Sequence, residues 1–116
     1  MIRKNVDIQK QTVPIFRGEI AEIATYDFFN EQDVNGLGRR FTKVIIPRDN
    51  LYKAHIHEGE MEAIYILNGQ ALVLDNNEEV LLEAGDCHIC RDGETHAIKN
   101  AGKENLEYLS VVLFNK

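Results

Sequence analysis

Three features are scarce in this sequence of 116 residues, and each scarcity excludes a class of protein. There are only two cysteines, so a framework of disulfides does not hold the fold together. Basic residues number 13 against 19 acidic ones, and a net charge of −6 argues against a general nucleic-acid surface, which needs a basic stripe to displace counterions. No run approaches the roughly 20 apolar residues that cross a bilayer, and no apolar core of a secretory signal stands near the start. We therefore expect a soluble, cytoplasmic protein with neither a membrane nor a nucleic acid as partner.

The apolar residues that are present make up 44% of the chain, which is enough for the core of one domain over residues 1–116. They occur in short β-rich runs separated by turn residues. These runs predict strands at 24–29, 40–46, 51–57, 62–67, 70–74, 78–82, 87–90, 96–99 and 106–114. Asn68-Gly69 is expected to join two of them, 62–67 and 70–74, as a hairpin. Many short strands without a long amphipathic helix indicate an all-β sandwich or barrel.

The N-terminal part is less clearly patterned. Residues 1–14 are mostly polar and fit either a short edge strand or an arm exchanged with a partner. The next stretch, 15–29, has near-helical spacing of some apolar residues, but Gly18 interrupts it. We favour strands there.

The clearest chemical signal is the stretch HIHEGEMEAIYILNG, which begins at His55. The two-residue period of a strand sends His55 and His57 to the same face, with Cα atoms roughly 6.6 Å apart. Glu62 opens the next run, and His96 lies on a later short strand. Three imidazoles and one carboxylate suit a divalent first-row metal, and an octahedral ion would keep two positions open for a ligand.

The spacing of these residues resembles two motifs of the cupin superfamily. The first is matched by His55-Ile56-His57, four residues, Glu62, six residues and Gly69, with Asp49 where the family has its opening Gly. The second is matched by Gly85, five residues, Arg91-Asp92-Gly93, two residues, His96, three residues and Asn100, with Arg91 where the family has Pro. Either motif alone would be a weak signal, but the joint match is specific.

The resemblance is to small single-domain cupins of the cupin 2 type, and it implies a jelly-roll or double-stranded β-helix barrel. Motif 1 then covers about 49–69 and motif 2 about 85–100. By the same resemblance, four residues fall on the family's metal-ligand positions: His55, His57, Glu62 and His96. The implied cofactor is a divalent Mn, Fe, Ni or Zn ion.

The resemblance leaves the reaction open. It implies an enzyme acting on a small oxygen-rich substrate, of the dioxygenase or of the sugar or keto-acid isomerase type. The alternative is a non-catalytic module that binds a small, sugar-like molecule in the same pocket. No unliganded carboxylate is identified as a catalytic base. Because small cupins are usually dimers, we expect a homodimer, formed by the N-terminal arm or by an outer sheet face.

The C-x-x-C sequence at Cys87 and Cys90 invites a redox or zinc interpretation. On a short strand, however, the two thiols face opposite sides, so we interpret them as small buried hydrophobic residues. His88 either lines the barrel or faces solvent.

Three further expectations concern the surroundings of the site. Arg91 adds a cation near the barrel mouth, and Glu58 and Glu60 form a solvated turn face. Tyr52, Tyr65 and Tyr108 fit either hydroxyl donors to a substrate or, more commonly in strands, half-buried packing residues, and the sequence does not rank them.

Overall fold

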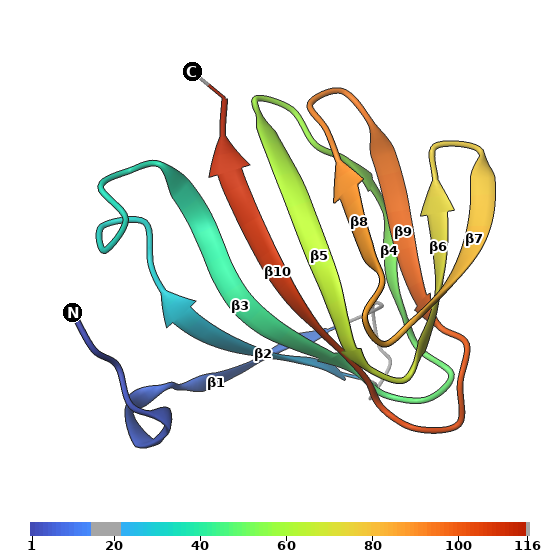
Figure 1. Ribbon diagram of the computed structural model, residues 1–116, viewed down its shortest axis with the longest axis horizontal. Coiled ribbons are helices and arrows are strands. Elements are labelled where there is room, and N and C mark those ends of the chain that lie inside the picture. Colours follow the sequence, from blue (N-terminus) through green and yellow to red (C-terminus); the bar gives the residue numbers. More distant parts are fainter. Residues whose placement is uncertain (15–21, 116) are drawn as a thin grey trace.

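The protein is described by a computed structural model that covers residues 1–14 and 22–115 (Figure 1). Short runs of alternating or β-branched residues form strands, and Gly, Asn and Asp residues turn the chain between them. In chain order the elements are the 3-10 turn η1 (Asn5–Asp7) and the strands β1 (Lys10–Pro14), β2 (Glu22–Phe29), β3 (Gly38–Ile46), β4 (Leu51–Ile56), β5 (Glu60–Asn68), β6 (Gln70–Asp75), β7 (Glu78–Glu83), β8 (Cys87–Cys90), β9 (Thr95–Asn100) and β10 (Leu106–Phe114). No helix among these residues is long and apolar enough to cross a membrane.

The strands form two antiparallel sheets. The larger has the order β1-β2-β3-β10-β5-β8, and the smaller has the order β4-β9-β6-β7. One core of buried side chains draws on strands of both sheets, including β3, β5 and β10 of the larger and β6 and β9 of the smaller. Figure 1 shows the smaller sheet beside β5 and β8 of the larger one. The predicted all-β, jelly-roll architecture is confirmed.

The inward-facing residues change from apolar to partly polar along β10. On β10, inward-facing residues alternate with outward-facing ones, and the inward series begins with the apolar Leu106 and Tyr108. Further along the strand, the inward Ser110 lies opposite Thr42 of β3, and the inward Val112 lies opposite Glu62 of β5. Buried polar groups therefore gather at the end of the larger sheet where β3 and β5 begin, and a buried carboxylate there needs partners.

The expected hairpin at Asn68-Gly69 is wrong. The chain does reverse there, but β5 belongs to the larger sheet and β6 to the smaller, so the two strands do not pair. Gly69 has a φ of +87°, and a Cβ at this position would lie 2.9 Å from the carbonyl oxygen of Asn105. A turn signal in the sequence specifies a change of direction and the need for glycine, but not which sheet the next strand enters.

The N-terminal predictions are settled in part. Strand β1 pairs with β2 at the edge of the larger sheet, so residues 10–14 form an edge strand. The predicted strand at 24–29 lies within β2, while residues 15–21 lie outside the described residues. The other predicted strands differ only at their ends. Strand β4 stops one residue before His57, and β5 begins at Glu60, which the sequence places in the turn.

Candidate metal site

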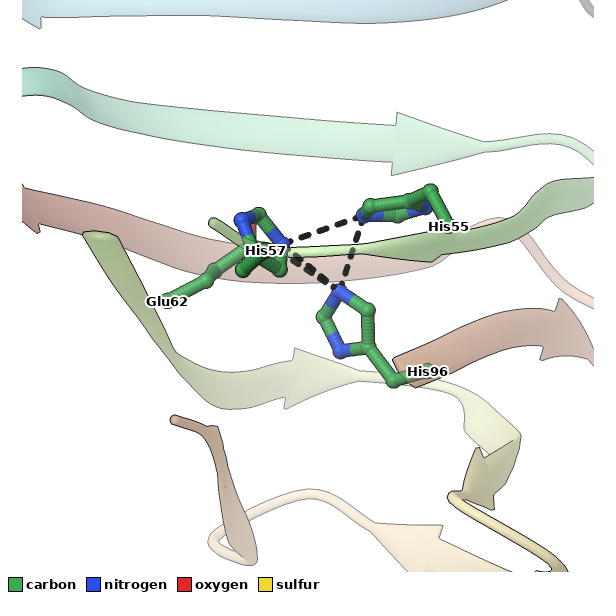
Figure 2. A group of neighbouring side chains, drawn as sticks. All are labelled: His55, His57, Glu62 and His96. Carbon is green, nitrogen blue, oxygen red and sulfur yellow. Dashed lines mark hydrogen bonds and ion pairs between the residues drawn. The ribbon is translucent and has the colours of Figure 1, made fainter. Parts of the chain in front are cut away.

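Strands of both sheets supply the four candidate ligands. His55 lies on β4 directly opposite His96 on β9, and His57 follows the end of β4. Glu62 comes from β5 in the larger sheet. Figure 2 shows the three imidazole rings and the carboxylate turned toward one another. The structure thus brings all four predicted residues into one group that could hold a metal ion.

The three Nε2 atoms form a nearly equilateral triangle. His55 and His57 are 3.1 Å apart at these atoms, His57 and His96 are 3.1 Å apart, and His96 and His55 are 3.0 Å apart. The Oε1 atom of Glu62 lies 2.9 Å from Nε2 of His96 and 3.2 Å from Nε2 of His57. His57, Glu62 and His96 are buried, whereas His55 is partly exposed.

This triangle fits a shared metal ion. Metal–imidazole bonds of about 2.0–2.1 Å place neighbouring nitrogens of an octahedral ion roughly 3.0 Å apart, and those of a tetrahedral ion roughly 3.4 Å apart. The observed 3.0–3.1 Å spacings match the octahedral value. Three neutral imidazoles whose Nε2 lone pairs meet at this distance repel one another, and an ion bound by all three removes that repulsion.

Outer hydrogen bonds orient two of the rings. Nδ1 of His55 lies 2.6 Å from the carbonyl oxygen of Lys53, and Nδ1 of His57 lies 2.9 Å from Oε1 of Glu60. Both oxygens are acceptors, so each Nδ1 carries the proton and each Nε2 is left with its lone pair toward the site. Glu60 is held in turn by Arg39, which donates from Nε and Nη2 at 2.7 and 2.6 Å.

Glu62 is kept ionised by its neighbours. Burial alone would raise the pKa of this carboxyl, but the close imidazoles of His57 and His96 and the hydrogen bond from Ser110 lower it well below the ordinary value. The Ser110 hydroxyl donates to Oε2 and leaves Oε1 directed at the imidazoles. Arg39 is the main cause that lowers the pKa of Glu60 to about 2. Both carboxylates therefore stay charged at neutral pH.

The environment affects two of the histidines in opposite ways. The hydrogen bond with Glu62 is the main reason that the pKa of His57 is raised. Burial lowers the pKa of His55, and the neighbouring imidazoles add to that effect. One ring is therefore protonated more readily than an ordinary histidine and the other less readily. Such divergence is typical of functional sites.

A small pocket of about 150 Å³ opens onto the candidate ligands. Its lining consists of Arg39, Arg40, Tyr52, His55, His57, Glu62, Ile98 and Tyr108. The two arginines differ in their partners. Arg39 is paired with Glu60, whereas Arg40 makes no hydrogen bond or ion pair within residues 1–14 and 22–115. The pocket therefore combines the ligand group with one uncommitted guanidinium and the tyrosines Tyr52 and Tyr108.

Some expectations about the surroundings are wrong. Glu60 is not part of a solvated turn face, because its side chain is only 13% exposed and binds both His57 and Arg39. Glu58 is exposed, as expected. Arg91 does not line the pocket and lies near Glu94 instead. Both arginines that line the pocket come from β3, a strand that its sequence predicts only as an apolar element. The register of β3 and β5 with β10 places Arg40 level with Glu62.

The C-x-x-C strand places its two thiols on opposite sides, as predicted, but the prediction of a small buried hydrophobic residue is wrong for Cys87. Cys87 is exposed, Cys90 is buried, and both thiols are free. Burial raises the pKa of Cys90 to about 11, so this thiol is inert at neutral pH. His88 takes the first of its two predicted positions. It lies inside, with its ring stacked on that of His96 at 5.5 Å between centroids, and burial lowers its pKa.

A two-sheet jelly roll that directs three imidazoles and one carboxylate from both sheets at a single point is the arrangement typical of cupins. The chain belongs to this family, because the family model described as the cupin domain matches residues 43–112, a range that contains all four candidate ligands.

Three relatives illustrate the range of the similarity. An oxalate-binding protein of Thermotoga maritima is 30% identical over 97% of this chain and 93% of its own length. A crystal structure from the same organism, described as a predicted oxalate decarboxylase, superposes with a TM-score of 0.91 at 30% identity and covers 99% of this chain and 100% of that one. A sugar phosphate isomerase from Silicibacter pomeroyi shares the fold at 14% identity, with a TM-score of 0.78 over 97% of this chain and 74% of that one.

Proposed function

We propose that this cupin is a metal-dependent enzyme that binds and transforms a small oxygen-rich anion. His55, His57, Glu62 and His96 are the proposed ligands of a divalent Mn, Fe, Ni or Zn ion. The observation that carries the proposal is the triangle of Nε2 atoms at 3.0–3.1 Å beside a pocket that contains an uncommitted arginine. An octahedral ion with four protein ligands keeps two positions for a substrate.

The charges of the site favour a dianion. Glu60 neutralises Arg39, and Glu62 offsets one of the two charges of a divalent ion. Arg40 adds a further positive charge, so two positive charges remain to be matched by the ligand. A short dicarboxylate can place one carboxylate on the ion and the other on a guanidinium, which is well suited to carboxylates. The name of the oxalate-binding relative agrees with this substrate class.

The side chains that line the pocket would contact the bound substrate, and the ion would supply a separate function. When bound, the ion supplies a Lewis acid or an oxygen-binding centre. Arg40 would hold the far carboxylate, and the hydroxyls of Tyr52 and Tyr108 would donate to its oxygens. The pKa of Tyr108 is raised, chiefly by burial, so its hydroxyl stays a donor.

A second candidate function is binding without turnover. It is favoured by one observation: apart from Glu62, no carboxylate lines the pocket in the part of the chain that the structure describes. Glu60, the nearest alternative, is held by Arg39. A reaction that needs a carboxylate base in the pocket would therefore have none available, while ligand binding needs only the ion and Arg40.

The test begins with metal analysis of the purified protein and with titration calorimetry of oxalate against the metal-loaded and the chelator-treated protein. We expect metal-dependent binding, weaker binding of the monoanion formate, and a loss of oxalate affinity of about tenfold or more in Arg40→Gln. Arg48→Gln, at an exposed loop position, is the matched control. Oxalate affinity that is independent of metal would contradict the proposal. Oxygen uptake and product analysis with oxalate and other small oxygen-rich anions then distinguish an enzyme from a binding module.

We also propose that the protein is a homodimer. Large apolar side chains are exposed on the outward-facing positions of the larger sheet, at Phe41, Tyr65, Leu67 and Leu113. Such a patch is typical of an interaction surface. Sedimentation analysis of the wild type and of Tyr65→Glu tests this, since a charge in the centre of the interface would shift the dimer toward monomer. A cytoplasmic location stays a prediction.

A further inference from the structure

The third imidazole of the site, His96, differs from the other two on its far side. Nδ1 of His55 has a carbonyl acceptor and Nδ1 of His57 has a carboxylate acceptor. Nδ1 of His96 is buried and has no hydrogen-bond partner in the described residues. Since the whole side chain is 0% exposed, bulk water does not reach this nitrogen. A buried polar atom left in this state is destabilising and therefore needs a partner.

A second unpartnered nitrogen lies next to it. His88 projects inward from β8, and its ring stacks on the His96 ring with 5.5 Å between centroids and 29° between planes. Nε2 of His88 is also buried without a partner in the described residues. Two adjacent rings, which come from different sheets, thus each carry one orphaned nitrogen.

These two nitrogens have complementary hydrogen-bonding roles, one as donor and the other as acceptor. To direct the Nε2 lone pair at the site, His96 must carry its proton on Nδ1, and that proton needs an acceptor. A neutral His88 with its proton on Nδ1 offers an acceptor lone pair on Nε2. The two atoms make no direct hydrogen bond, and a single water between them could accept from His96 and donate to His88.

We propose that His88 is a positioning residue for the site. It accepts, through one bridging water, the hydrogen bond that begins at Nδ1 of His96, and so fixes the tautomer and the ring orientation of this ligand. His88 then plays for His96 the part that Lys53 plays for His55 and Glu60 for His57. The inference rests on the proposed metal function, and it assigns a role to a residue outside the ligand set.

The experiment compares two substitutions of His88 by metal-affinity titration against a chromophoric chelator. His88→Phe keeps a stacked ring but removes the acceptor, and we expect a loss of metal affinity of about 10- to 100-fold. His88→Gln keeps an acceptor at similar reach and should restore most of the affinity. Equal affinity in the wild type and in His88→Phe would overturn the inference. A loss of affinity that is the same in both variants would also overturn it.

A second measurement does not depend on metal loading. Long-range ¹H–¹⁵N spectra of the metal-free protein report which nitrogen of each histidine carries the proton. We expect a larger fraction of His96 to be protonated on Nδ1 in the wild type than in His88→Phe, because Oε1 of Glu62, 2.9 Å from Nε2 of His96, favours the other tautomer. A wild-type His96 protonated on Nε2 would overturn the inference even if His88→Phe failed to fold. Absence of metal binding in the wild type would instead count against the proposed function, so the two failures are distinguishable.

Discussion

Replacing Glu60 by Gln should weaken metal binding although Glu60 is not one of the proposed ligands. Its Oε1 atom lies 2.9 Å from Nδ1 of His57, and its two oxygens accept bonds of 2.6 and 2.7 Å from Arg39. Glutamine retains an acceptor for Nδ1 but loses the negative charge that makes the imidazole a stronger ligand. Loss of such an outer carboxylate reduces metal affinity by about 10- to 100-fold, which corresponds to about 1.4–2.8 kcal/mol.

The assay is a competition titration of the apoprotein with a chelator of known affinity, carried out for each metal that the purified protein retains. The chain offers a matched control in Glu58→Gln, because Glu58 lies two residues away, carries the same charge and is exposed. We expect Glu58→Gln to bind like the wild type, since exposed charges at this distance are screened. Equal affinities of Glu60→Gln and Glu58→Gln would refute the reasoning that a carboxylate behind His57 strengthens the site.

Three further predictions concern the ligand set, the acid stability and the cysteines. His55→Ala should abolish metal binding yet leave the circular dichroism spectrum unchanged, and metal content equal to that of the wild type would exclude His55 as a ligand. The pKa of Glu60 is lowered from 4.5 to about 2, so its ionised carboxylate contributes stability that is present above about pH 4.5 and is lost as the pH falls toward 2. Over this pH window, the melting temperature of the metal-free protein should therefore fall less in Glu60→Gln than in the wild type. A thiol reagent should label the exposed Cys87 rapidly in the native protein and Cys90 only after unfolding, and equal labelling rates would disprove their opposite orientation.

The strands could be predicted from the sequence because their signals are local. The Leu- and Val-rich run that forms β10 and the run between Gly38 and Pro47 that forms β3 are recognised from neighbouring residues alone. The error at Gly69 has a different origin. Whether β6 pairs with β5 or enters the other sheet depends on the neighbours that β6 finds there, β7 and β9, which the turn itself does not encode.

The grouping of the four candidate ligands was predictable for a related reason. Residues His55 and His57 share a strand face, and the motif spacing adds Glu62 and His96. The supporting residues carry no such signal. In the sequence Glu60 looks like any acidic turn residue, because its partner in the fold, Arg39, lies 21 positions away. Arg40 likewise reaches the pocket only through the register of β3 with β10.

The division of the candidate ligands between two sheets has a mechanical consequence. His96 belongs to β9 and Glu62 to β5, strands that share no backbone ladder. An ion held by both would cross-link the two layers at the polar end of the core, where apolar packing is weakest. Amide hydrogen exchange in β5 and β9 would then slow together on metal loading and quicken together on chelation, although no backbone hydrogen bond joins the two strands.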